Sequence, residues 1–248
     1  MLRRAIHVVR SAVRQVGLDI SRYPGPSSPV GRRMALLRHF AVDTVIDVGA
    51  NVGQYALELR RLGYRGYIIS FEPLPAAVAR LRSRAAKDPS WRVIPIALGK
   101  RNGSATLHVA SNSVSSSLLP MLQRHVDAAP ASAYVDAIEV EVRRLDDIFD
   151  DIAGSARAPF LKLDVQGAEG EVLAGARQTL PRLVGLQVEL SLVELYRGAP
   201  MFVEVISWLM AQGFTLMGLE PGFCNPKTGQ LLQFDGLFFR PAAARTDK

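Results

Sequence analysis

Cysteine is nearly absent from this chain of 248 residues, which contains only Cys224. A single cysteine excludes an internal disulfide framework and agrees with a reducing cytosol. No histidine lies near Cys224 in the sequence to activate it as a nucleophile. Histidine is also scarce, with four in total, and no dense histidine and cysteine cluster predicts a zinc site. We therefore expect a cytoplasmic protein without structural zinc.

Most of the chain has no excess of positive or of negative charge. The net charge is +7, but residues 1–40 hold eight of the 30 basic residues and one of the 23 acidic residues. Residues 41–248 therefore carry 22 of each sign. Such a balance gives no general basic face for nucleic acid, so we expect no nucleic-acid partner. The sequence does not indicate an oligomeric state.

The basic N-terminus lacks a long apolar run. Residues 2–20 carry apolar groups at helical spacing, and Arg10 and Arg14 interrupt any signal-peptide core. The segment is also too polar for a transmembrane span. The pattern predicts a basic amphipathic helix, which either packs on the rest of the protein or lies on an anionic membrane surface.

Proline, glycine and serine then mark a boundary. Residues 23–31, YPGPSSPVG, are typical of a linker, and residues 32–40 are predicted to form a short helix. We therefore divide the chain into an N-terminal extension, residues 1–40, and one main domain, residues 41–248.

The main domain begins with the stretch TVIDVGANVG, Thr44–Gly53. Its β-branched residues predict a buried strand, and Gly49 and Gly53 allow a tight turn into the helix that follows. The free backbone N–H groups at the start of that helix would face a ligand bound on the turn.

The nature of this ligand depends on the glycines and on the next strand. The dinucleotide pattern G-x-G-x-x-G fails at two positions, because Asn51 and Gln54 stand where glycines are needed. The second predicted strand, Tyr67–Phe71, ends at Glu72, where a carboxylate would meet ribose hydroxyls. The pattern favours a nucleoside without a diphosphate, such as S-adenosylmethionine (SAM). The predicted cofactor-binding residues of this region are Asp47, Gly49, Asn51, Gly53 and Glu72.

Four motifs in order strengthen this interpretation: DVGANVGQYA, FEPLP, IALG and LKLDVQGAEGEVLAGA. Together they resemble the FkbM-type family of SAM-dependent methyltransferases, over roughly residues 42–240. The resemblance implies a class I methyltransferase-like (Rossmann-like) α/β fold, with a mostly parallel seven-stranded sheet and an antiparallel C-terminal strand. It also implies that Ala97 and Leu98 border the adenine, although plain strand-end packing explains them equally well.

The strand pattern agrees with that architecture. Seven strands are predicted, at residues 44–48, 67–71, 91–97, 158–164, 183–190, 214–219 and 231–240. Long crossovers between the first five predict parallel pairing. Residues 103–145 form an insertion whose serine-rich centre, Ser111–Pro120, is either a substrate lid or an exposed loop.

Methyl transfer to an alcohol requires a base. The candidates are Asp164, Glu169, Glu189 and His125. We favour Asp164, because it ends a strand beside the sheet's crevice, whereas Glu169 has an alternative role at a helix N-terminus. His125 is alternatively a solvated loop histidine. Asp164 and Glu189 are also plausible ligands for a divalent metal, although nothing in the sequence indicates a metal.

These features predict a SAM-dependent O-methyltransferase that acts on a hydroxyl, on the sugar of a glycolipid or of a secondary metabolite. Methylation of a nitrogen or of a protein side chain, and a SAM-binding scaffold without turnover, are the alternatives. A glycolipid acceptor would place residues 1–20 at the inner membrane surface as a peripheral contact. Asp235, in the last predicted strand, is expected at the rim of the pocket.

Overall fold

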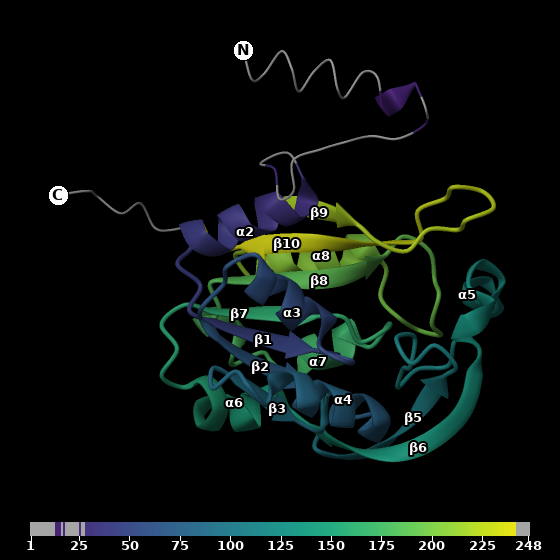
Figure 1. Ribbon diagram of the computed structural model, residues 1–248. Helices are drawn as coiled ribbons and strands as arrows, with labels where there is room; N and C mark the ends of the chain where they lie inside the picture. The colour runs from purple at the N-terminus through teal and green to yellow at the C-terminus, as the bar shows by residue number, and fades with distance from the viewer. Residues whose placement is uncertain (1–12, 16, 18–24, 26–27, 242–248) are drawn as a thin grey trace.

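A computed structural model describes residues 13–15, 17, 25 and 28–241. Its centre is a seven-stranded sheet in the order β3-β2-β1-β7-β8-β10-β9, parallel from β3 to β8, with β10 antiparallel to both of its neighbours (Figure 1). The strands are β1 (Thr44–Val48), β2 (Tyr67–Phe71), β3 (Trp91–Ile94), β7 (Pro159–Leu163), β8 (Gly185–Ser191), β9 (Thr215–Pro221) and β10 (Gln233–Phe239). The predicted fold class is confirmed.

Helices cover both faces of this sheet, as Figure 1 shows. One face packs against α2 (Pro29–His39), α3 (Gln54–Arg61) and α4 (Pro75–Ala85). The other packs against α6 (Leu145–Ala153), α7 (Glu169–Ala174) and α8 (Phe202–Ala211). Because successive side chains of a strand point to opposite faces, Val45 enters the first core and Ile46 the second.

Helix α2 begins earlier than its composition suggests. Pro29 stands in its first turn, and the Oγ of Ser28 accepts a hydrogen bond from the backbone N–H of Gly31 at 3.0 Å. Serine is a favoured N-cap and proline suits the first turn. The predicted linker therefore ends before Ser28, and its last residues belong to the helix. The predicted helix over residues 2–20 lies almost entirely outside the described residues.

A second, three-stranded sheet extends from the main one. It joins β4 (Ala97–Leu98), β6 (Tyr134–Arg143) and β5 (Gly103–Ala110), with β6 in the middle. The predicted third strand, residues 91–97, was too long, because it ends at Ile94 and Ala97 pairs with Val142 of β6 instead. Pro95 lies at the break, and proline has no N–H to donate to a ladder.

The connection from β5 to β6 is not a featureless loop. It contains the short helix α5 (Gln123–Ala128) and a 3₁₀ turn (Pro130–Ser132). Across the part of the chain that the structure describes, none of the helices combines the length and the apolar character needed to cross a membrane.

Candidate functional site

The loop after β1 depends on two glycines with left-handed backbone. Gly49 has φ +78°, and a β-carbon there would lie 1.8 Å from the backbone carbonyl oxygen of Asp164. Gly53 has φ +88°, and a β-carbon there would meet Leu81 and Trp91. Gly49 thus lets the loop approach the end of β7, whereas Gly53 allows packing behind the loop at the start of α3.

Glu72 fastens this loop to the end of β2. Its Oε2 accepts a hydrogen bond from the backbone N–H of Asn51, and its Oε1 accepts one from Leu74, both at 2.8 Å. Asn51 has φ +46°, so the carboxylate holds a conformation that non-glycine residues seldom adopt. The side chain is buried, and burial raises the pKa of Glu72.

A narrow cleft, which we call the nucleoside cleft, opens between this loop and the second sheet. Five of the seven predicted cofactor-binding residues line it: Gly49, Asn51, Glu72, Ala97 and Leu98. Apolar walls come from Val48, Phe71 and Ile96. An apolar slot for a base beside a carboxylate for ribose hydroxyls suits a nucleoside.

The serine-rich segment predicted as a lid or loop covers this cleft. Ser117 Oγ donates to the carbonyl oxygen of Gln166 at 2.6 Å, and the Nδ2 of Asn51 donates to Ser113 Oγ at 3.3 Å. The free space beneath the segment is about 50 Å³. The segment thus contacts both loops that border the cleft.

The other two predicted cofactor-binding residues, Asp47 and Gly53, do not line the cleft. Asp47 is fully buried beneath the loop, where its Oδ1 lies 3.4 Å from Lys162 Nζ and its Oδ2 accepts from Ser70 Oγ at 3.4 Å. Burial raises the pKa of Asp47, opposed by Lys162. Asp47 therefore contacts Lys162 and Ser70 and is separated from the cleft.

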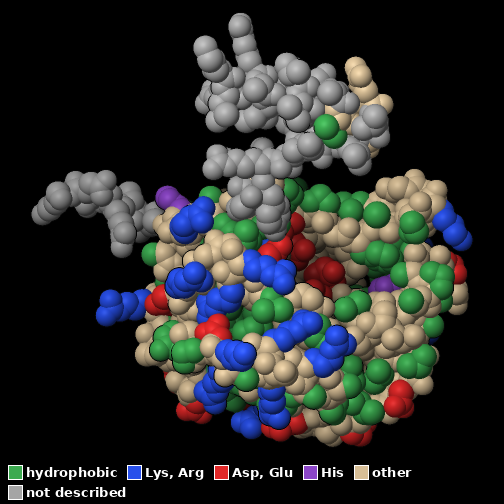
Figure 2. All heavy atoms as spheres, in the orientation of Figure 1, with side chains coloured by type: hydrophobic (Ala, Val, Ile, Leu, Met, Phe, Trp, Pro, Cys, Tyr) green, Lys and Arg blue, Asp and Glu red, His purple; other side chains and the backbone are tan. Residues whose placement is uncertain are grey.

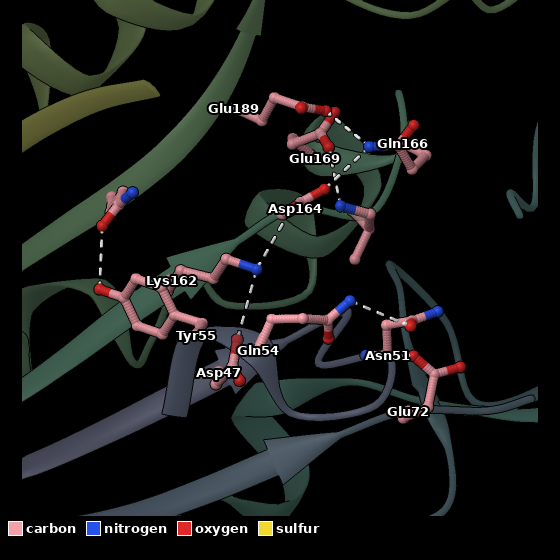
Figure 3. A network of polar contacts seen from close by, with 12 residues as sticks. Asp47, Asn51, Gln54, Tyr55, Glu72, Lys162, Asp164, Gln166, Glu169 and Glu189 are labelled. Atoms are coloured by element: carbon pink, nitrogen blue, oxygen red, sulfur yellow. Dashed lines mark hydrogen bonds and ion pairs between the residues drawn. The ribbon is translucent and has the colours of Figure 1, made fainter. Parts of the chain in front are cut away.

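Lys162 is the central residue of this region, and sequence analysis did not identify it. Figure 3 shows its ammonium group between Asp47 and Asp164, with Nζ 3.2 Å from Asp164 Oδ2. Burial favours the neutral amine, but Asp164 and Asp47 outweigh it and raise the pKa of Lys162. The positive charge of this buried lysine is therefore favoured by its two carboxylate partners. The sequence feature that could have identified it is a lysine inside the apolar strand FLKLD.

Lys162 belongs to a row of polar side chains on the α3 face of the sheet. Ser70, Asp47, Lys162 and Gln187 are neighbours in register across four strands. Tyr55 of α3 lies over this row, and its hydroxyl donates to Gln187 Oε1 at 2.9 Å. Burying such a row is costly unless its members are paired. Ser70 donates to Asp47 and Lys162 forms an ion pair with it, although Asp47 Oδ1 has no hydrogen-bond partner among the described residues.

A cavity of about 510 Å³ lies between this row and helices α2 and α3. Its ionisable lining residues are Arg33, Tyr55, Glu58, Arg61, Lys162, Asp164, Glu220 and Asp235, and we call it the charged cavity. Figure 2 shows a hollow below α2 with acidic side chains in its depth and basic side chains beside it. The expected rim position of Asp235 agrees with this lining. The charged cavity and the nucleoside cleft share Gly49, Asn51, Val114 and Asp164, so the two spaces meet there.

Asp164, the preferred catalytic candidate, lies at this junction, while Glu189 lies outside both cavities. Gln166 connects them, because its Nε2 donates to Asp164 Oδ1 at 2.9 Å and to Glu189 Oε2 at 3.0 Å (Figure 3). Gln233 also donates to Glu189 Oε2, at 2.8 Å. Burial, together with the charge of Asp164, raises the pKa of Glu189 well above its usual range.

Glu169 and His125 line neither cavity. Glu169 accepts from the backbone N–H groups of Val165 at 2.9 Å and Gly167 at 3.3 Å, and burial raises its pKa to about 7. It thus stabilises the turn into α7.

The alternative of a solvated His125 was wrong. The side chain is 3% exposed, and its ring centroid lies 5.2 Å from that of Tyr196 and 5.1 Å from that of Phe223. Burial lowers the pKa of His125 to about 4.

No group of three or more histidine, cysteine, aspartate or glutamate side chains within the described residues is arranged to hold a metal ion.

Comparisons with known proteins place this chain in a protein family. Residues 47–216 match the family model described as "Methyltransferase FkbM domain". The chain is 30% identical over 183 residues to the 2-O-methyltransferase NoeI of Sinorhizobium fredii, covering 71% of this chain and 75% of that protein. It is 29% identical over 213 residues to the 31-O-demethyl-FK506 methyltransferase FkbM of Streptomyces tacrolimicus, covering 76% and 79%. Among solved structures, an rRNA methylase from Streptococcus thermophilus aligns with 14% identity and a TM-score of 0.47, over 90% of this chain and 99% of that one.

Proposed function

Since this chain belongs to the FkbM family of SAM-dependent methyltransferases, we propose that it transfers a methyl group to a hydroxyl, on the sugar of a glycolipid or of a secondary metabolite. When bound, SAM supplies a methyl group already activated on a sulfonium. The residues that would hold it line the nucleoside cleft: Gly49, Asn51 and Glu72 on the ribose side, and Ala97 and Leu98 beside the adenine.

The observation that carries the proposal is the junction of the two cavities at Asp164. An acceptor in the charged cavity would lie next to the end of the nucleoside cleft. The cavity's lining offers carboxylates, two guanidinium groups, an ammonium and side-chain amides, and such a mixture of donors and acceptors suits a molecule rich in hydroxyl groups.

The names of the two relatives point the same way. One is called a 2-O-methyltransferase and the other a 31-O-demethyl-FK506 methyltransferase, and both names specify transfer to oxygen. These names support oxygen as the atom methylated here over the nitrogen of the alternative hypothesis.

The chain's own residues would position the acceptor and exclude water. Lys162 and Gln166 hold Asp164 from two sides, so this carboxylate is fixed where the acceptor enters. In this proposal Glu189 supports Asp164 through Gln166, Glu169 stabilises the turn, and His125 packs in an aromatic cluster.

The serine-rich segment serves as a lid. Ligand pockets typically hold roughly 300–1,000 Å³, whereas the nucleoside cleft offers about 50 Å³. Entry of the cofactor therefore requires the segment to move, which would break the hydrogen bonds of Ser113 and Ser117 to the two loops.

Product identification tests the proposal. The full-length protein is incubated with SAM carrying a tritiated methyl group and with fractionated cell extract. Label in a lipid-extractable glycan or in a glycosylated small molecule is expected. Label found only in protein or RNA would overturn the proposal, and SAM binding without turnover in every fraction would favour the scaffold alternative.

A further inference from the structure

Four carboxylates line the charged cavity, and they differ in their partners. Glu58 and Glu220 both pair with Arg33, and Asp164 pairs with Lys162. Asp235, on β10, forms no ion pair with any residue that the structure describes. It is half-buried and interacts with the side chain of Gln187. Asp235 is therefore the cavity carboxylate whose charge is least committed to a protein partner.

Asp164 already has a partner at each of its carboxylate oxygens. Its Oδ2 lies 3.2 Å from Lys162 Nζ, and its Oδ1 accepts from Gln166 Nε2 at 2.9 Å. Loss of the ion pair with Asp164 would leave the buried ammonium of Lys162 with Asp47 alone. The arrangement engages both carboxylate oxygens of Asp164 and fixes the side chain in place.

Most of the charged groups around Asp235 are carboxylates. Its cross-strand neighbours are Glu189 on β8 and Glu220 on β9, and Asp164, which follows β7, lines the same cavity. Lys162 on β7 and Arg33 on α2 partly compensate this negative charge. Burial first, and then Asp164, raise the pKa of Asp235 to about 6.

We propose that Asp235 is the general base that removes the proton from the acceptor hydroxyl, while Lys162 and Gln166 hold Asp164 as a positioning residue. This inference rests on the proposed function. As the hydroxyl oxygen forms its bond to the methyl carbon, the carbon–sulfur bond breaks and its electron pair stays on sulfur. The proton passes to the Asp235 carboxylate and from there to water. No other reactant is consumed.

A base of this kind suits neutral conditions. General bases work best when their pKa lies near the operating pH, because they are then ionised and still basic. Asp235 meets both requirements at pH 7. Asp164, by contrast, already accepts from Lys162 at one oxygen and from Gln166 at the other.

The test compares Asp235→Asn with Asp164→Asn, with Asp235→Glu as the conservative variant and Asp136→Asn as the control. Asp136 is exposed on β6 and lines neither cavity. The rate of tritium transfer from SAM to the extract fraction that the wild-type protein labels is measured between pH 5 and 9. The affinity for S-adenosylhomocysteine is measured by calorimetry, and the melting temperature is followed over the same pH range.

We expect the wild-type rate to rise with pH around 6, and Asp235→Asn to lower the plateau about 100-fold or more and to abolish that rise. Asp164→Asn should lower the rate but keep its rise with pH. Asp235→Glu should retain part of the activity that Asp235→Asn loses. Affinity for S-adenosylhomocysteine should stay within about twofold in Asp235→Asn. Its melting temperature should exceed the wild-type value above pH 6, because the buried charge is gone.

Three results would overturn the inference: a rate and pH dependence unchanged in Asp235→Asn, a tenfold loss of S-adenosylhomocysteine affinity in that variant, or loss of the rise in Asp164→Asn alone. The tenfold loss would show that Asp235 holds the cofactor. If the wild-type protein labels no fraction, the proposed function itself fails, and with it the inference.

Discussion

The backbone carbonyl oxygen of Asp164 occupies the space that a side chain on Gly49 would need, only 1.8 Å from the position of its β-carbon. The loop after β1 and the end of β7 are therefore packed backbone to backbone at the point where the two cavities meet.

The substitution Gly49→Ala should prevent this approach. A left-handed conformation costs a non-glycine residue about 1–2 kcal/mol, and the contact with Asp164 adds to that. We expect a large loss of unfolding free energy in urea, together with weaker SAM binding. The matched control is Gly63→Ala, which has φ +90° but nothing within 4 Å of its β-carbon. Equal losses in the two variants would show that the contact with Asp164 is unimportant.

Removal of the Glu72 carboxylate should loosen both the loop and the ribose site. Glu72→Ala leaves the N–H groups of Asn51 and Leu74 without their acceptor. We expect calorimetry to show SAM binding weaker by about 1–3 kcal/mol, the usual effect of losing a buried charged acceptor. Glu139→Ala, on the exposed face of β6, is the control. Unchanged affinity in a folded Glu72→Ala protein would refute the assignment of this carboxylate to the cofactor.

His125 should make the protein sensitive to mild acid. Its pKa falls from 6.5 to about 4 on burial, so between these values the unfolded chain binds a proton that the folded protein excludes. The unfolding free energy should therefore decrease as the pH falls from about 6.5 to 4, by up to about 1.4 kcal/mol per pH unit. Urea titrations at several pH values measure this slope. His125→Leu should lack the contribution of this residue, and an identical slope in the variant would contradict a neutral, buried imidazole.

Residues 1–20 should bind anionic membranes if the acceptor is a glycolipid. Each arginine near anionic headgroups contributes on the order of 1 kcal/mol of attraction, and residues 1–20 contain four arginines. Liposome flotation at low salt compares the full chain with a protein that begins at Gly25. That start keeps the backbone carbonyl of Gly25 that accepts from Ser28 Oγ, and the N-cap of α2.

The full chain should float and the shortened one should not, provided that both bind SAM. Equal flotation, or none for either protein, would reject the membrane role. Unfolding of the shortened protein would instead indicate that residues 1–24 pack on the main domain.

The parts of the site that could be predicted are those whose structure is determined by residues close together in the sequence. The strand, the glycine turn and the acid-ended second strand follow from local alternation and from backbone requirements. Gly49, Asn51 and Glu72, which were predicted on this basis to bind the cofactor, line the nucleoside cleft. Ala97 and Leu98 required the family resemblance, because the strand that carries them is two residues long.

The charged cavity could not be predicted in this way. Lys162 and Gln187 meet only through the pairing of β7 with β8, and Tyr55 reaches Gln187 from a helix far away in the sequence. His125 was misread for the same reason. It lies in a polar stretch, and the rings of Tyr196 and Phe223 that bury it come from distant segments.

The row of polar side chains also favours one register of the strands in the sheet. In the observed alignment Asp47 faces Lys162, and Lys162 faces Gln187. A slip of β7 by one residue would turn every side chain to the opposite face. The ammonium group of Lys162 would then enter the apolar layer formed with α6, α7 and α8, without a carboxylate to pair with. The charges that shape the cavity therefore also select one strand alignment over its neighbours.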